Sequence, residues 1–213
     1  MKVTHGFVSF TEVAAGHHRS YNAWHLFDHL PEQYRLPGVV FGQRWVLTPP
    51  LRAHARATAP LDRTHYVTLY LMADPIEETL RDFRALALGL REKGRFHEHR
   101  TSHLFGPMAV RDCAASDQAL VAAEAVPFRP NTGVHVRLSS EPSDLAEQPG
   151  AAGAWTFTGT ELSPPELLGV TMTVAWLDGD PDALAPSLAS THDLFSATCA
   201  SIDPFGTWDW FDS

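Results

Sequence analysis

Apolar positions along the chain fall into short runs that alternate with polar segments containing Pro and Gly. Four runs have the β-branched and aromatic composition of strands: 2–12, 38–49, 64–73 and 95–110. A helical stretch follows Gly16, and apolar residues at helical spacing predict a second helix after the third strand. Asp74 is its expected N-cap, Pro75 lies in its first turn and Gly94 ends it. The predicted order is β-α-β-β-α-β, the split βαβ unit.

The same order of elements recurs in the second part of the chain. The run "GVHVRLSS" (133–140) resembles the first strand, and "VTMTVAWLDGDPDAL" (170–184) resembles the third strand with its helix, including an Asp-Pro start at Asp180. "AEQPGAAGAWTF" parallels "YRLPGVVFGQRW", and "DPFGTW" (203–208) parallels "SHLFGPM". The first helix of the copy is reduced to "SEPSDLAEQ". Four parallels in one order predict an internal duplication.

We therefore expect an α+β protein built from two tandem ferredoxin-like (βαββαβ) halves, the second of them degenerate. The first half covers 1–110, an Ala-rich linker covers 111–130, and the second half covers 131–213. Only the first half keeps a full first helix and a set of histidines, so the working pocket is expected there.

Charge and cysteine content narrow the class of protein. A formal net charge of -9 over 213 residues argues against nucleic-acid and anionic-membrane partners, because both require basic patches. The two cysteines, Cys113 and Cys199, are too few for a disulfide framework and suit a reducing compartment. The N-terminus lacks the pattern of a signal peptide, and no apolar run has the length of a membrane span. These features predict a soluble cytoplasmic protein with a small-molecule partner.

A set of motifs spans the first helix and the second strand: Tyr21-Asn22-x-Trp24, His29-Leu30-Pro31, Leu36-Pro37-Gly38 and Arg44-Trp45. Over about 30 residues the chain resembles the EthD-like branch of the dimeric α+β-barrel superfamily. It departs from that pattern at His25, where an aromatic residue is common, and at Phe27, where an acidic one is common.

The resemblance implies that two four-stranded sheets meet face to face as a barrel with the helices outside. It also implies a pocket between one sheet and its helices. A duplicated chain can build this barrel from its own halves, as a pseudo-dimeric monomer, or can form a homodimer. Relatives include cofactor-free monooxygenases, polyketide cyclases, decarboxylases, isomerases and some haem enzymes. The C-terminal "FGTWDWFDS" is expected to form a final strand or a plug on the barrel.

The first helix carries the leading chemical candidates. A regular helical wheel places one group on a common face, with Asp28 at its edge: Tyr21, Trp24, Phe27 and Leu30. It places His18, His25 and His29 on a flank, away from the centre of that face. His25 and His29 are four residues apart and can share a proton or a metal, or can be solvated or cap the helix end. For His29 the resemblance implies that it orients the pocket or acts as an acid or base.

Histidines also mark the predicted fourth strand. His97, His99 and His103 would share one face with Phe105, because strand side chains alternate. His5 is expected to join them if the register allows, and His65 begins the third strand. These histidines could line a wet groove, serve as acids or bases, or hold a metal with a carboxylate such as Glu98. No ligand motif of established spacing is present, so no metal site is predicted.

The resulting hypothesis is a cofactor-independent acid/base lyase, cyclase or isomerase acting on an aromatic or polyketide-like compound. His29 is the leading base, and the other catalytic candidates are His25, Asp28, His97, His99 and His103. The expected substrate contacts are Phe7, Tyr21, Trp24, Arg44, His65 and Phe105. The alternatives are a monooxygenase, cofactor-free or dependent on haem or a divalent metal, and a non-catalytic binding protein.

Overall fold

The computed structural model describes residues 2–190 and 193–212. These residues form nine strands: β1 (Val3–Val13), β2 (Val39–Val46), β3 (Arg56–Ala57), β4 (Tyr66–Ala73), β5 (Arg100–Ala115), β6 (Gly133–Ser139), β7 (Ala151–Thr158), β8 (Thr171–Leu177) and β9 (Phe195–Ser201). They also form five α-helices: α1 (His18–Trp24), α2 (Leu30–Gln33), α3 (Pro49–Arg52), α4 (Ile76–Glu92) and α5 (Pro181–Leu188). A π-helical turn, His25–His29, joins α1 to α2. None of the described helices is both long and apolar enough to cross a bilayer.

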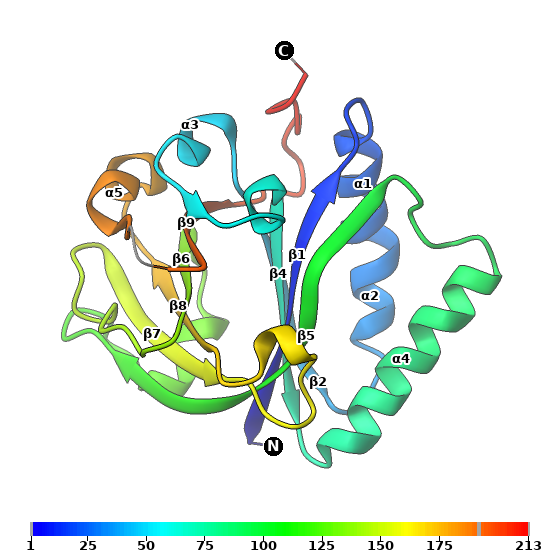
Figure 1. The fold of residues 1–213 in the computed structure, drawn as a ribbon, viewed down its shortest axis with the longest axis horizontal. Helices are drawn as coiled ribbons and strands as arrows, with labels where there is room; N and C mark the ends of the chain where they lie inside the picture. The colour runs from blue at the N-terminus through cyan, green and yellow to red at the C-terminus, as the bar shows by residue number, and fades with distance from the viewer. Residues whose placement is uncertain (1, 191–192, 213) are drawn as a thin grey trace.

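The strands close into an eight-stranded antiparallel barrel (Figure 1). The strand order is β2-β4-β1-β5-β7-β8-β6-β9, and β9 pairs back onto β2, while β3 extends the edge of β9. Each half contributes four neighbouring strands, and in both halves the order is second, third, first, fourth. The prediction of two tandem ferredoxin-like halves that form one α+β barrel is confirmed.

A single hydrophobic core fills the inside of the barrel. Because strand side chains alternate, one face of every strand points inward. Val8 and Phe10 of β1 lie against Trp45 of β2, and Trp155 and Trp176 come from the second half. All five are almost completely buried, so the two halves share one core.

Helices cover the two sheets unequally. In Figure 1, α1, α2 and α4 lie together on the outer side of the first sheet. On the second sheet α5 is only eight residues long, and the described segment 140–150 contains no helix. Leu145 and Ala146 from that segment instead pack against Ala154, Leu177 and Leu188. The second half is therefore degenerate in its helices, and its outer face is filled by a loop.

Two predicted strand boundaries were wrong. The fourth strand, β5, begins at Arg100 and continues to Ala115, since it pairs with β1 along its first part and with β7 along its second. The last strand, β9, precedes the "DPFGTW" segment, which forms turns, so the parallel with "SHLFGPM" was wrong. Trp210 and Phe211 of the C-terminal segment pack against a small cluster that includes Val13 and Tyr66, as a plug and not as a strand.

The two Asp-Pro helix starts differ. Asp180 caps α5, where its carboxylate accepts a hydrogen bond from the Asp182 amide at 3.1 Å. Asp74 does not cap α4: Pro75 occupies the capping position, and the Asp74 carboxylate accepts from the Thr4 hydroxyl at 3.0 Å. The cap predicted at Asp74 was wrong because a neighbouring strand supplies a competing donor.

Candidate functional site

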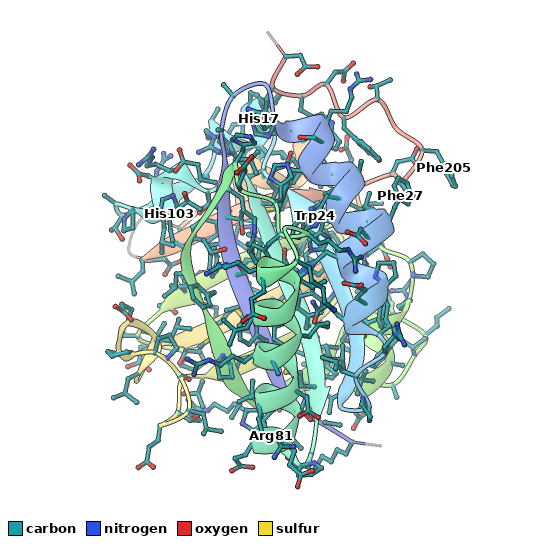
Figure 2. The ribbon with its side chains drawn as sticks, turned by 90° about the vertical axis from the view of Figure 1, so that its right-hand side faces the viewer. His17, Trp24, Phe27, Arg81, His103 and Phe205 are labelled. Carbon is teal, nitrogen blue, oxygen red and sulfur yellow. The ribbon has the colours of Figure 1, made fainter. Side chains whose placement is uncertain are left out.

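A cleft of about 1460 Å³ lies between the first sheet and the helices that cover it. Figure 2 shows α4 beside the α1–α2 helix over the strands, with Trp24 between them. The cleft therefore occupies the first half, where the sequence predicted the working pocket.

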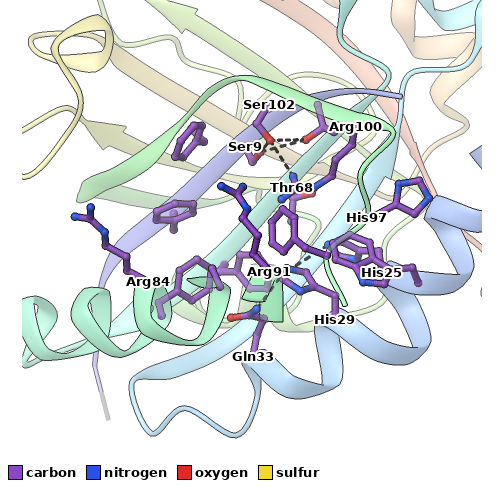
Figure 3. Close-up of a pocket in the computed structure, with 18 of the residues that line it drawn as sticks. Ser9, His25, His29, Gln33, Thr68, Arg84, Arg91, His97, Arg100 and Ser102 are labelled. Atoms are coloured by element: carbon purple, nitrogen blue, oxygen red, sulfur yellow. Dashed lines mark hydrogen bonds between the residues drawn. The ribbon is translucent and has the colours of Figure 1, made fainter. Parts of the chain in front are cut away.

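The sheet supplies a floor that changes from polar to aromatic. Ser9 of β1, Thr68 of β4 and Ser102 of β5 line it, and the Ser9 hydroxyl donates to the Ser102 hydroxyl at 3.1 Å (Figure 3). Phe7 and Phe105 follow toward the other end. Because alternate residues of β1 face outward, polar and aromatic groups on one strand both reach the cleft.

The α1–α2 helix, which forms one wall of the cleft, buries a row of polar side chains against the sheet. Its buried polar residues recur at intervals of three or four positions: His18, Asn22, His25, His29 and Gln33. Phe27, which the helical wheel placed on one face with Tyr21, has 60% of its surface exposed, whereas Tyr21 has 1%. The wheel was wrong for Phe27 and for the histidines that it placed on a flank. The sheet floor beneath the helix is itself polar, so it accepts His25 and His29 as buried neighbours. The π-helical turn also shifts the helical phase between His25 and His29.

His29 is fixed between an aromatic plane and an amide. Its ring stacks on Trp24 with centroids 4.4 Å apart, and its Nε2 lies 3.3 Å from the Gln33 carboxamide nitrogen. Burial lowers the pKa of His29 to about 3, and the charges of Arg100 and Arg44 act in the same direction. The imidazole is therefore neutral at physiological pH. The sequence-based hypothesis assumed a histidine with an ordinary pKa of about 6.5, and the pKa of His29 lies well below that value.

His25 is more deeply enclosed. Its Nε2 lies 3.3 Å from the Tyr70 hydroxyl, and burial raises the pKa of Tyr70, so that hydroxyl stays protonated. Burial, followed by the charge of Arg44, holds the pKa of His25 well below 6.5. Nδ1 of His25 and Nδ1 of His29 are both buried without a hydrogen-bond partner. The site thus holds two neutral imidazoles, each with one unpaired nitrogen.

Two arginines beside these histidines have no carboxylate partner among the described residues. Arg44 is buried behind the helix, donates to the side-chain amide oxygen (Oδ1) of Asn22 at 2.5 Å and lies 4.6 Å from the centre of the Tyr21 ring. Arg100 donates to the Ser102 hydroxyl at 2.9 Å from the first position of β5. Nε of each guanidinium is buried without a partner. Their positive charge is therefore uncompensated.

The predicted face of three histidines on the fourth strand was wrong. His97 and His99 precede β5 and line the cleft from a loop, where the His99 ring stacks on His17 at 3.5 Å. His103 lies on β5 but outside the cleft lining, and its Nε2 meets the Glu12 carboxylate at 2.8 Å.

Other predicted residues also have different surroundings. His5 contacts Thr4 and pairs with Ala109, so it does not join the other histidines. His65 lies outside the cleft lining, near the Phe211 ring. Arg44 is likewise not part of the lining.

Nine predicted residues do meet in the cleft: Phe7, Tyr21, Trp24, His25, Asp28, His29, His97, His99 and Phe105. Among them Asp28 is bound in an ion pair by Arg95, which also pairs with Glu32 at 2.7 Å. Its carboxylate is therefore committed to holding the loop before β5 against the helix.

Sequence reasoning missed a group of lining residues: Ser9, Gln33, Thr68, Tyr70, Arg84, Arg91, Arg100 and Ser102. A signal existed for Gln33, which follows His29 by one helical turn. The arginines gave no signal, because isolated arginines at the end of a helix or the start of a strand are common on any surface.

Metal and haem can be compared with the donors present. No three His, Cys, Asp or Glu side chains of residues 2–190 and 193–212 gather closely enough to hold a metal ion. An axial haem ligand needs a side-chain nitrogen that faces the iron. Nε2 of His25, His29 and His97 already contacts Tyr70, Gln33 and Ser20, respectively. As placed, none of these three histidines offers a free Nε2 to an iron.

Comparison with known proteins supports the fold and not a specific activity. No protein-family model matches the sequence, and no curated protein matches it. A solved structure of the chlorite dismutase-like protein TA0507 superposes with a TM-score of 0.54 at 9% identity, covering 100% of this chain and 99% of that one. The fold is that of a chlorite dismutase-like α+β barrel.

Two other solved structures superpose with lower scores. A monooxygenase-like protein from Lactobacillus acidophilus NCFM has a TM-score of 0.49 at 7% identity, covering 95% of this chain and 100% of that one. A chlorite dismutase from Candidatus Nitrospira defluvii has a TM-score of 0.48 at 10% identity, covering 100% and 97%. Because no family model and no curated protein matches, the EthD-like branch stays a prediction, and function has to be argued from the cleft.

Proposed function

We propose that the cleft is the active site of a cofactor-independent acid/base enzyme of EthD-like type, a lyase, cyclase or isomerase that acts on a small aromatic or polyketide-like carbonyl compound. The observation that supports it best is the neutral imidazole of His29, positioned by Trp24 and Gln33. The charges of Arg44 and Arg100 act on this imidazole, and neither arginine has a carboxylate partner among the described residues. A base and a source of positive charge lie on one wall of an aromatic-lined cavity, as abstraction of a proton next to a carbonyl requires.

Proton transfer is assigned to the nitrogen of His29 that lacks a partner. Nδ1 carries the lone pair when Nε2 holds the ring hydrogen and donates it to the Gln33 carboxamide oxygen, which has no other partner and comes to face Nε2 when the amide group is turned over. Nδ1 is then the position at which the ring accepts a proton. Burial, together with the charges of Arg100 and Arg44, lowers the pKa of His29 and keeps the imidazole neutral. An enolate that forms beside the arginines would offset their charge. The pKa of His29 would then rise toward neutrality as the substrate loses its proton. Arg100, from the cleft wall, would stabilise the developing oxyanion.

Proton exchange gives a test that does not require the natural substrate to be known. A panel of aryl ketones and β-keto acids is incubated with the protein in D₂O, and loss of the proton next to the carbonyl is followed by NMR. We expect exchange with at least one compound, and a decrease of about 10²-fold or more in His29→Gln.

His103→Gln is the matched control, because His103 lies outside the cleft, and we expect its exchange rate to equal that of the wild type. No exchange across the panel, or equal rates in His29→Gln and the wild type, would overturn the assignment. Oxygen consumption during conversion of a panel compound would favour a monooxygenase. Tight binding with the compound returned unchanged would favour a binding protein.

A further inference from the structure

The cleft concentrates positive charge in a protein whose formal net charge is -9. Four arginines line it: Arg84, Arg91, Arg95 and Arg100. Arg95 is neutralised by its ion pairs with Asp28 and Glu32. The other three form no ion pair with any carboxylate of the described residues. A cleft with uncompensated guanidiniums attracts anions, and it does so more strongly where the groups are shielded from water.

Two of these arginines converge on one aromatic ring. The Arg100 guanidinium lies 4.3 Å from the centre of the Phe96 ring and 5.6 Å from that of Trp24. The Arg91 guanidinium lies 5.0 Å from the centre of the same Phe96 ring. Figure 3 shows Arg91 extending from α4 toward the sheet and Arg100 near Thr68.

These contacts determine what the guanidinium offers to a ligand. A cation–π contact with an aromatic face consumes none of the N–H donors of the guanidinium, so they stay available for hydrogen bonds. Arg100 donates one hydrogen bond to the Ser102 hydroxyl, and its Nε is buried without a partner. A carboxylate is the anion that matches two parallel donors along the edge of a guanidinium.

The other end of the cleft offers aromatic surface. Phe7 lies 4.9 Å from Phe83 and 6.3 Å from Phe105, measured between ring centroids. Phe105 keeps 54% of its surface exposed, which is unusual for an aromatic residue inside a cleft. Ser102 and Phe105 both face the cleft because the pairing of β5 with β1 shifts register between them. They are three residues apart, at most roughly 10 Å at the rise of a strand. That length suits one flat, one- or two-ring aromatic group with a carboxylate at its end.

We propose that the ligand of this cleft is an aromatic carboxylate, with its carboxylate on Arg100 and Arg91 and its rings against Phe7, Phe83 and Phe105. The proposal rests on the cleft assigned above as the active site and names the chemical class of its substrate. When the ligand binds, its carboxylate brings a negative charge close to His29. This charge partly offsets the positive charges of Arg44 and Arg100, which have no carboxylate partner in the part of the chain that the structure describes.

The test uses 2-naphthoate as the probe, with the uncharged 2-naphthamide as its isosteric control, and isothermal titration calorimetry on the full chain as the measurement. We expect 2-naphthoate to bind at least about tenfold more tightly than the amide, since the amide cannot form the charge-assisted pair. We expect Arg91→Gln and Arg100→Gln each to weaken binding of the acid by a similar factor and to leave binding of the amide unchanged.

Arg81→Gln is the matched variant, because Arg81 lies on the same helix, pairs with Asp82 and does not line the cleft. It should bind 2-naphthoate as the wild type does. Arg91 is exposed, so its variant reports on the site even if Arg100→Gln fails to fold. The inference is overturned if the acid does not bind at millimolar concentration, if acid and amide bind equally, or if Arg91→Gln binds the acid unchanged. Binding of the acid without proton exchange on any compound would contradict only the proposed reaction.

Discussion

At the scale of single residues, two buried histidines differ in how their nitrogens are used. His135 in the second half has Nδ1 at 2.8 Å from the Thr198 hydroxyl and Nε2 at 3.3 Å from the Ser196 hydroxyl. His29 has one nitrogen paired and one without a partner. Burial alone therefore does not mark a chemical role, and a fully satisfied imidazole such as His135 is a structural group.

His135 gives a prediction about stability and pH. Burial lowers its pKa to about 3 from an ordinary value of 6.5. The unfolded chain therefore binds a proton below pH 6.5 that the folded chain does not. The stability contribution is complete above pH 6.5 and is lost as the pH falls toward 3. Between pH 7.5 and 5 this one group should lower the free energy of unfolding by about 2 kcal/mol.

Urea unfolding at pH 7.5 and pH 5 measures this effect. His135→Gln should be less stable than the wild type at pH 7.5, because it disturbs a packed site, and it should lose about 2 kcal/mol less on acidification. The comparison within each protein cancels the cost of the substitution itself. An equal loss in both proteins would show that His135 does not carry this part of the pH dependence.

At the scale of elements, α4 is held against the sheet by close contact at one end. A Cβ on Gly38, in the turn before β2, would lie 1.8 Å from the Thr79 hydroxyl oxygen of α4. That hydroxyl donates to the Ala73 carbonyl at 3.2 Å, so it is fixed in place. The Pro37-Gly38 pair was noticed for its resemblance to a family motif, and the packing of α4 gives a physical reason for the glycine.

Two glycine substitutions separate packing from helix propensity. Gly38→Ala should destabilise the protein by about 1–3 kcal/mol, because α4 has to move away from the turn. Gly89→Ala, within α4, meets no atom within 4 Å and should stabilise it by about 0.5–1 kcal/mol. Thermal unfolding monitored by circular dichroism measures both. Equal and small effects at the two positions would contradict the assigned contact with Thr79.

At the scale of the whole molecule, one chain supplies all eight strands of the barrel. The two halves meet at the β5–β7 and β2–β9 seams and share the core that contains Phe10, Trp45 and Trp155. Each half covers the inner face of the other, so neither face is left exposed. The halves should therefore fold as one cooperative unit.

This arrangement predicts a single unfolding transition that does not depend on protein concentration. A barrel completed within one chain needs no partner to bury its core, whereas an obligate dimer becomes more stable as concentration rises. Differential scanning calorimetry over a hundredfold range of concentration measures it. Two separate transitions would contradict the shared core, and a midpoint that rises with concentration would contradict the self-sufficient barrel.

The sequence by itself determined the alternation of strands and helices, the duplication and the half that holds the cleft. These follow from periodicity and turn residues, which are local properties. Only the tertiary structure decided the orientation of the first helix, the separation of His103 from His97 and His99, and the gathering of Arg91 and Arg100 around Phe96. A helical wheel assumes an apolar floor, but this floor contains Ser9 and Thr68, so the row of polar side chains turned inward. Burial and charge at His29 depend on neighbours more than 60 residues away in the chain, such as Arg100, and no local pattern records them.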